Sequence, residues 1–149
     1  MEKFKIAQSD LKDTVEAVKS IKEQFSDMDA CMVLYFASPS YPEVDVSLQM
    51  ANVFAGSHTV GCTTAGEMIT GKMGQDGIVA MAWPKASLKY LKIAILENIQ
   101  TDMDAVAKAF HSFEKSLGKP MSQLNPEDYV GMIIVDGLSG CEEKLNDQL

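Results

Sequence analysis

The sequence predicts a single α/β domain in which helices flank a mixed β-sheet. Two observations predict this class: apolar runs typical of strands alternate with segments of helical periodicity, and one adjacent pair of strands is separated only by a short turn. The chain has 149 residues, of which 46% are hydrophobic and 23% charged, enough for one core without disulfide bonds or structural metals. We therefore expect residues 1–149 to form one domain of strand–helix alternation with one inserted antiparallel hairpin.

The first part of the chain predicts two strands and the helices that cover them. A weak strand is expected over residues 3–7. Residues 11–25 carry apolar side chains at helical spacing with charges between them, which predicts an amphipathic helix. Residues 31–37 are an unbroken apolar run followed by two prolines, which is typical of a strand buried on both faces. Residues 43–55 are apolar on more than one side, which predicts a helix that is buried or that exposes an apolar surface to a partner.

The middle of the chain predicts a third strand and a hairpin. Residues 58–62 predict the strand, and residues 63–77 predict a long loop that contains several glycines. Residues 78–83 and 88–96 flank a short Pro-Lys-Ala-Ser sequence, so we expect them to pair as the inserted antiparallel hairpin.

The last part of the chain predicts a helix, a strand and a final amphipathic segment. Residues 101–117 begin with a sequence like a capping box, repeat apolar side chains at helical spacing and end at Gly118. Residues 129–136 predict another buried strand. The segment 139–149 shows no helix stop signal, so we expect the chain to be part of a longer protein. We expect this segment and residues 43–55 to expose apolar surface for a further domain.

Charge and composition exclude several classes of protein. The net charge is −8 and none of the 13 basic residues is arginine, so the chain lacks the side chains that usually read nucleic acids. No apolar run approaches the roughly 20 residues of a membrane span, and the first residues lack the apolar stretch of a secretory signal. Three scattered cysteines do not suggest a disulfide framework. We expect a cytoplasmic protein that binds no nucleic acid and does not insert into membranes.

Residues 66–72 match most of a phosphate-binding P-loop but lack its chemistry. A P-loop needs a serine or threonine after its lysine to bind Mg²⁺, and a helix whose N-terminus faces the phosphates. Here Met73 follows Lys72, and the glycine-bearing residues 74–77 do not open a helix. The sequence therefore predicts a flexible loop rather than a site that hydrolyses nucleotides.

Cys62 is the candidate nucleophile, because it stands at the end of a predicted strand. A catalytic cysteine needs a base beside it, and the two histidines are His58 and His111. The more frequent role of such a residue is a small buried side chain, and Cys31 fits the same role. The cysteines and histidines include no close pair of the kind that binds zinc, so we expect no metal site. Haem needs only one axial ligand, and spacing does not exclude it.

Two strand-to-loop junctions, at residues 61–67 and 136–140, combine glycines, hydroxyls and a carboxylate. Ligands of open α/β sheets bind beyond the carboxyl ends of strands, where backbone N–H groups are free. The candidate ligand-binding residues are Cys62, Thr63, Thr64, Gly66, Glu67, Asp136 and Ser139. We expect the two loops to lie side by side, with Thr63 and Glu67 in an exposed loop. Ordinary turns and helix caps use the same residue types, so the residues alone leave both interpretations open.

The heptapeptide Gly61-Cys62-Thr63-Thr64-Ala65-Gly66-Glu67 resembles the most recognisable motif of the N-terminal domain of the FIST family, the F-box and intracellular signal-transduction proteins. Residues 36–41 and 135–140 are similar to two further stretches of that domain. The resemblance covers roughly residues 30 to 149.

The resemblance implies a sensory domain of a bacterial signalling protein rather than an enzyme. The implied ligand is a small molecule, with amino acids the usual suggestion, and the implied partners are a C-terminal FIST domain, a downstream signalling domain or a kinase. The acidic composition fits a cationic or zwitterionic ligand better than a phosphate. Two alternatives remain: a haem-binding nitric-oxide sensor that uses His58, His111 or a cysteine as axial ligand, and a cysteine-dependent enzyme that uses Cys62.

Overall fold

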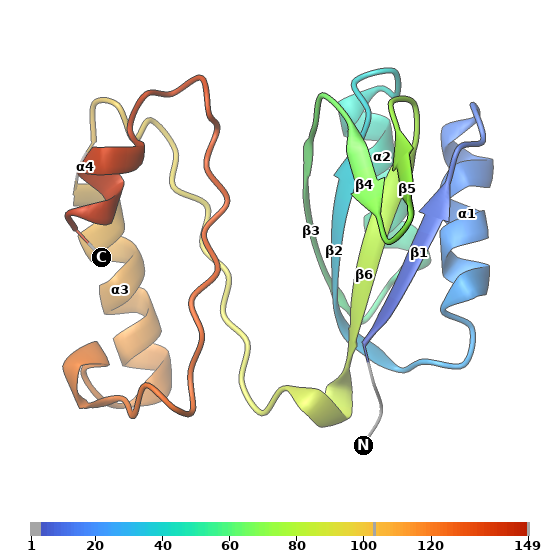
Figure 1. The fold of residues 1–149 in the computed structure, drawn as a ribbon. Coiled ribbons are helices and arrows are strands. Elements are labelled where there is room, and N and C mark those ends of the chain that lie inside the picture. Colours follow the sequence, from blue (N-terminus) through green and yellow to red (C-terminus); the bar gives the residue numbers. More distant parts are fainter. Residues whose placement is uncertain (1–3, 103, 149) are drawn as a thin grey trace. The chain divides into compact units, whose positions relative to one another are not determined.

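The computed structural model describes residues 4–102 and 104–148. The chain divides into two compact units, Met1–Tyr90 and Leu91–Leu149, and each is described by itself (Figure 1). The first unit holds the β-sheet and two helices, and the second holds a longer helix and a short final one.

A mixed four-stranded sheet forms the frame of the first unit. The strand order is β1-β6-β2-β3, where β6 is antiparallel to both of its neighbours and β2 is parallel to β3. The bounds are Lys5–Ser9 for β1, Ala30–Ala37 for β2, His58–Thr63 for β3 and Ile78–Pro84 for β6. β1, β2 and β3 therefore run in one direction and end at the same edge of the sheet (Figure 1). The predicted α/β class with a mixed sheet flanked by helices is confirmed.

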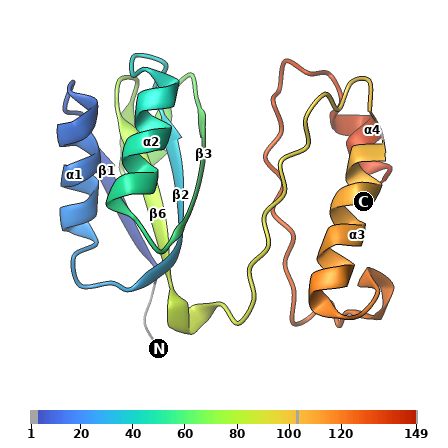
Figure 2. The same cartoon turned by 180° about the vertical axis from the view of Figure 1, so that it is seen from behind.

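Both helices of the first unit cover the same face of the sheet (Figures 1 and 2). α1 (Thr14–Gln24) follows Asp13, whose carboxylate accepts a hydrogen bond from the N–H of Glu16 at 3.0 Å and so caps the helix. α2 (Glu43–Val53) connects the parallel strands β2 and β3, which need a crossover of this kind. The helices predicted over residues 11–25 and 43–55 are confirmed.

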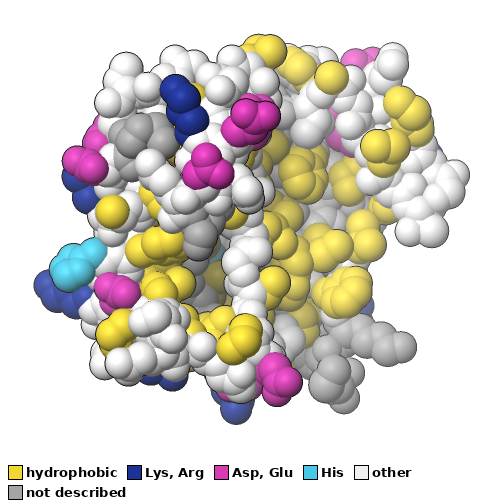
Figure 3. Space-filling model, turned by 60° about the vertical axis from the view of Figure 1, so that its left-hand side comes forward, with side chains coloured by type: hydrophobic (Ala, Val, Ile, Leu, Met, Phe, Trp, Pro, Cys, Tyr) yellow, Lys and Arg dark blue, Asp and Glu magenta, His cyan; other side chains and the backbone are white. Residues whose placement is uncertain are grey.

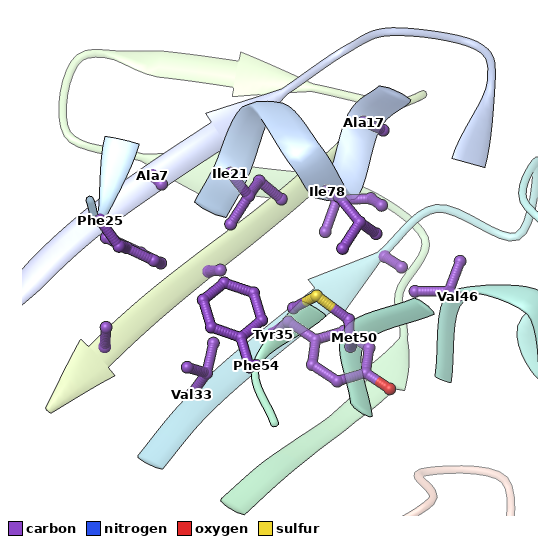
Figure 4. Close-up of a cluster of buried hydrophobic side chains, with 14 of the residues drawn as sticks. Ala7, Ala17, Ile21, Phe25, Val33, Tyr35, Val46, Met50, Phe54 and Ile78 are labelled. Atoms are coloured by element: carbon purple, nitrogen blue, oxygen red, sulfur yellow. The ribbon is translucent and has the colours of Figure 1, made fainter. Parts of the chain in front are cut away.

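The core of the first unit lies between these helices and the sheet (Figure 4). Alternate residues of each strand point into it, because successive side chains of a strand face opposite sides. The buried cluster includes Ala7 from β1, Val33, Tyr35 and Ala37 from β2, Ile78, Ala80 and Ala82 from β6, Ala17, Val18 and Ile21 from α1, and Val46 and Met50 from α2. Phe25 and Phe54, which follow the two helices, pack with their rings tilted by 57° and their centroids 6.2 Å apart. α2 leaves Val44 and Leu48 exposed, at 70% and 55%.

A small antiparallel pair lies inside the segment that the sequence predicts as one long loop. β4 (Glu67–Ile69) pairs with β5 (Lys72–Gly74), and Thr70 and Gly71 form the turn between them. Gly71 has a φ of 78°, a left-handed conformation that glycine adopts without strain. The antiparallel hairpin of this fold is therefore residues 67–74.

The hairpin predicted from residues 78–83 and 88–96 does not form. Residues 78–83 belong to β6, but the chain then makes a 3₁₀ turn, η1 (Lys85–Ser87). The N–H of Lys85 donates to the carbonyl of Asp29 at 2.9 Å, so the end of β6 is tied to the chain before β2. The segment 88–97 contains no strand. The apolar residues of segment 88–96 are typical of a strand, but such a sequence does not by itself supply a pairing partner.

The second unit is built around one amphipathic helix. α3 (Asp104–Leu117) confirms the helix predicted over residues 101–117, and it ends at Gly118, whose φ is 72°. A 3₁₀ turn, η2 (Met121–Gln123), and the short helix α4 (Glu142–Asn146) follow. Among the described residues of this unit, the buried hydrophobic side chains are Ala105, Val106, Cys141 and Leu145.

The buried strand predicted over residues 129–136 is also wrong. This segment is extended but makes no ladder with another described residue, and most of its apolar side chains are exposed, Val130 at 92%. An apolar run becomes a strand only where a neighbour satisfies its backbone groups. Figure 3 draws one face of the molecule and shows hydrophobic side chains at its surface.

Candidate functional site

The carboxyl ends of three strands bring several polar loops to one edge of the sheet. Ser9 and Ala37 both stand opposite Ile78, the first residue of β6, and Ala37 also stands opposite Thr63, the last residue of β3. The loops that follow or precede these positions comprise residues 38–41, 63–67 and 75–77. We call these three segments the strand-end site, since ligands of open α/β sheets bind at such an edge.

Glu67 is the centre of the strand-end site. Its side chain is only 3% exposed, although the sequence places it in an exposed loop. One carboxylate oxygen accepts a hydrogen bond from the hydroxyl of Thr64 at 3.0 Å, and the other accepts one from the backbone N–H of Gly77 at 3.2 Å. The carboxylate therefore joins the start of β4 to the start of β6, and its first role is to hold the loops together.

The loop after β2 belongs to the same network. The N–H of Ser38 donates to the carbonyl of Gly77 at 2.9 Å, and its hydroxyl donates to the carbonyl of Gln75 at 2.9 Å. The buried Tyr41 hydroxyl donates to the carbonyl of Leu11 at 2.6 Å. Burial raises the pKa of Tyr41, and nearby carboxylates including that of Glu67 add to this effect. The hydroxyl of Tyr41 is therefore a neutral hydrogen-bond donor.

Sequence reasoning did not select Ser38 and Tyr41 as site residues. The signal that could have found them is the one used for Thr63 and Thr64, namely hydroxyl-bearing residues directly after a buried apolar strand. They were missed because the loop after residues 31–37 contains prolines in place of the glycines that mark the other two junctions.

The exposed part of the strand-end site carries hydroxyls and lies beside acidic residues. Ser40 and Thr63 are exposed, whereas Thr64 and Gly66 are half-buried. The N–H of Thr64 donates to the carbonyl of Ala37 at 3.0 Å, which keeps the loops after β2 and β3 together. The first turn of α2, directly after this site, adds the exposed carboxylates of Glu43 and Asp45. Hydroxyls with nearby carboxylates suit a ligand that carries an ammonium group.

Cys62 lacks the surroundings of a nucleophile. It is half-buried on β3, and burial raises the pKa of its thiol, so the thiolate is disfavoured at neutral pH. His58 is four residues earlier on the same strand, a separation of about 13 Å along an extended chain. These observations give no support to the cysteine-dependent enzyme.

Both histidines, His58 and His111, are exposed in the described part of the chain. Two cavities, of about 400 and 260 Å³, are lined by neither histidine nor cysteine. Within residues 4–102 and 104–148, no three side chains of the His, Cys, Asp or Glu type gather as they would around a metal ion.

Asp136 and Ser139 belong to the second unit, whereas Cys62, Thr63, Thr64, Gly66 and Glu67 belong to the first. Asp136 accepts a hydrogen bond from the N–H of Leu138 at 3.0 Å, and its carbonyl accepts one from the N–H of Ser139 at 2.9 Å. Gln100 donates to the carbonyl of Ser139 at 2.8 Å. These bonds are those of an ordinary Asx turn. That the two loops meet around one ligand stays a prediction.

In the described part of the chain, no helix has both the length and the apolar character needed to cross a membrane. A comparison with protein families finds that the FIST N domain matches residues 31–149, which is most of the chain and includes the strand-end site. No curated protein and no solved structure matches the sequence. Because one family pattern covers the chain from β2 to its last residue, the chain belongs to the family of FIST N domains, which is associated with sensing in signal transduction.

Proposed function

We propose that this chain is the ligand-sensing input domain of a cytoplasmic bacterial signalling protein. Its ligand is a small cationic or zwitterionic molecule, with an amino acid as the leading class. Its partners are a C-terminal FIST domain, a downstream signalling domain or a kinase. The observation that carries this proposal is the meeting of hydroxyl-bearing loops at the common carboxyl end of β1, β2 and β3.

The hydrogen-bond network around Glu67 supports this proposal, because it fixes the loops of the strand-end site before a ligand binds. Thr64 and Gly77 are fixed by the buried carboxylate, and Ser38 is fixed to Gly77 and Gln75. A ligand that meets fixed groups does not lose binding energy to ordering the loops. The exposed hydroxyl of Thr63 is then available for the ligand, whereas the hydroxyl of Ser40 donates a hydrogen bond to that of Ser38 at 3.0 Å.

The charge of the site favours an ammonium group over a phosphate. The chain contains no arginine, its net charge is −8, and the exposed carboxylates of Glu43 and Asp45 follow the loop after β2. The lysine beside the site, Lys12, is paired with Asp76 at 3.2 Å. An anion at this edge would therefore meet the exposed carboxylates of Glu43 and Asp45, whereas a zwitterion can place its ammonium there. The exposed hydroxyl of Thr63 offers a hydrogen-bond donor for a carboxylate.

The test is a binding screen with the full chain. Amino acids, short polyamines, dicarboxylic acids and haem are screened by thermal shift, and any ligand that raises the melting temperature is titrated by calorimetry. A specific ligand at 100 times its Kd stabilises the folded state by about 2.7 kcal/mol. An amine-bearing ligand that binds at a one-to-one ratio supports the proposal. A dicarboxylate as the sole ligand, or a haem complex with a Soret band, contradicts it.

A matched pair of variants places the ligand. Thr63→Ala removes an exposed hydroxyl from the strand-end site, and Thr70→Ala removes an exposed hydroxyl from the β4–β5 turn. Loss of a hydrogen bond to a charged ligand group weakens binding by about ten- to a hundredfold. We expect this loss in Thr63→Ala alone. Equal ligand affinity in the two variants would mean that the ligand does not bind at the strand-end site.

A further inference from the structure

The face of the sheet opposite the helices is largely apolar over β1, β2 and β6. The residues that alternate with the core positions include Ile6 of β1, Leu34 and Phe36 of β2, and Val79 and Met81 of β6. Two polar side chains also belong to this face: Gln8 of β1, opposite Val79, and the exposed His58 at the start of β3. Leu34 is buried and Ile6 is exposed, so this face is covered unevenly. The β4–β5 hairpin stands on the covered part.

A cavity of about 260 Å³ lies between this face and the hairpin. Strands β1, β2 and β6 supply its floor, and Met68, Ile69 and Thr70 of the hairpin supply a wall. The cavity is lined by no charged side chain, and the hydroxyl of Thr70 is the single side-chain hydrogen-bonding group in its lining. All of its lining residues belong to the first unit.

We propose that this cavity binds a small uncharged apolar molecule of about one aromatic ring. The size follows from comparison: a dry apolar cavity of about 150 Å³ holds a benzene molecule, and drug-sized ligands need about 300 Å³ or more. The chemical class follows from the lining, because an ion placed there would lose its hydration and meet no opposite charge. This site is separate from the strand-end site and does not depend on the function proposed for it.

The β4–β5 hairpin forms the side of the cavity that adjusts to the bound molecule. β4 is held at its first residue by the hydrogen bonds of Glu67, and the turn at Thr70 and Gly71 is exposed. Met68 stands on this wall with 75% of its surface exposed, and Met81 lies on the floor. Methionine side chains are flexible and polarizable, so they fill the gaps around guests of different shape. An exposed Met68 therefore gains a partner when the cavity is filled.

The experiment is a titration of the full chain with toluene and indole, followed by NMR of methionine methyl groups labelled with carbon-13. For probes of seven to nine heavy atoms we expect a Kd on the order of 0.1–1 mM. The methyl signals of Met68 and Met81 should shift, whereas that of Met50, which is buried on the helix side of the sheet, should stay in place. Benzoate, the charged counterpart of toluene, should bind at least tenfold more weakly.

A matched pair of variants completes the test. Met68→Ala and Met73→Ala each remove an exposed methionine, and the two residues stand opposite each other in the hairpin, but only Met68 lines the cavity. We expect Met68→Ala to weaken toluene binding about three- to tenfold and Met73→Ala to leave it unchanged. The proposal is overturned if benzoate binds as well as toluene, if every methionine signal shifts alike, or if both variants lose affinity equally.

Discussion

The backbone N–H of Gly77 donates a hydrogen bond to the buried carboxylate of Glu67, and this bond ties the β4–β5 hairpin to the start of β6. Only glycine fits at position 77, because a Cβ atom there would stand 2.9 Å from the carbonyl oxygen of Ser9. Glu67 and Gly77 are ten positions apart in the sequence, and their hydrogen bond joins β4 to the start of β6. The close approach of Gly77 to Ser9 adds the end of β1 to the same edge of the sheet, where we place the ligand.

Replacement of Glu67 should destabilise the fold before it affects a ligand. Glu67→Ala leaves the hydroxyl of Thr64 and the N–H of Gly77 without their acceptor, and a hydrogen bond to a charged group contributes about 1.5–3 kcal/mol. We expect a loss of free energy of unfolding in this range, measured by urea denaturation. Thr63→Ala is the control, since this exposed side chain should change stability by less than about 0.5 kcal/mol. Equal effects of the two substitutions would refute this account of the network.

Gly61 is constrained by the ring of Tyr35 on the neighbouring strand. A Cβ atom at position 61 would lie 2.5 Å from two atoms of that ring, so Gly61→Ala must displace a buried aromatic side chain. Forcing extra volume into a packed site costs about 1–3 kcal/mol, and we expect this loss in urea denaturation. Gly74→Ala is the matched control, because nothing lies within 4 Å of its added Cβ atom.

A double-mutant cycle isolates the contact between Gly61 and Tyr35. Tyr35→Leu removes the ring, so the cost of Gly61→Ala should fall by at least about half in that background. An unchanged cost would mean that the penalty comes from the backbone of β3 rather than from the ring.

The pKa of Cys62 predicts how its reactivity depends on pH. Burial raises this pKa, so the thiolate forms only at a pH above the range in which an exposed thiol ionises. Iodoacetamide labelling of the native protein, measured by mass spectrometry, should be slow at pH 7 and should rise steeply only above about pH 9. Protein unfolded in urea is the control and should react faster at every pH. Rapid labelling of native Cys62 at pH 7 would restore the cysteine-dependent enzyme as a candidate.

The sequence was sufficient for the frame of the first unit, because its signals are local. Helical spacing marks α1 and α2, and the apolar run at residues 31–37 marks β2, which like β6 has a neighbouring strand on both sides. The same reasoning failed at residues 88–96 and 129–136. Their apolar patterns are those of strands, but a strand also requires a partner, which a local pattern cannot reveal.

The sequence predicts where the candidate site lies along the chain, but it does not predict which of its side chains are buried and hydrogen-bonded. Residues 61–67 do stand at the end of a strand, as expected. The burial of Glu67 could not be predicted, because its two hydrogen-bond donors lie on either side of it and Gly77 follows a hairpin that the sequence did not indicate. Thr63 is exposed, as the sequence predicts, and its contact with a ligand stays a prediction.

The first unit should fold without the second. Every described member of its hydrophobic core lies between Ala7 and Ala82, whereas the residues of the second unit that the structure describes include few buried hydrophobic side chains. We therefore expect residues 1–90 alone to unfold cooperatively on heating, with the far-UV and near-UV circular dichroism signals lost together. Residues 91–149 alone should show no cooperative transition, since so small a core does not offset the entropy of ordering the chain. Residues 1–90 that keep their secondary structure but lose near-UV signal and bind ANS would show that this core needs residues 91–149 to complete its packing.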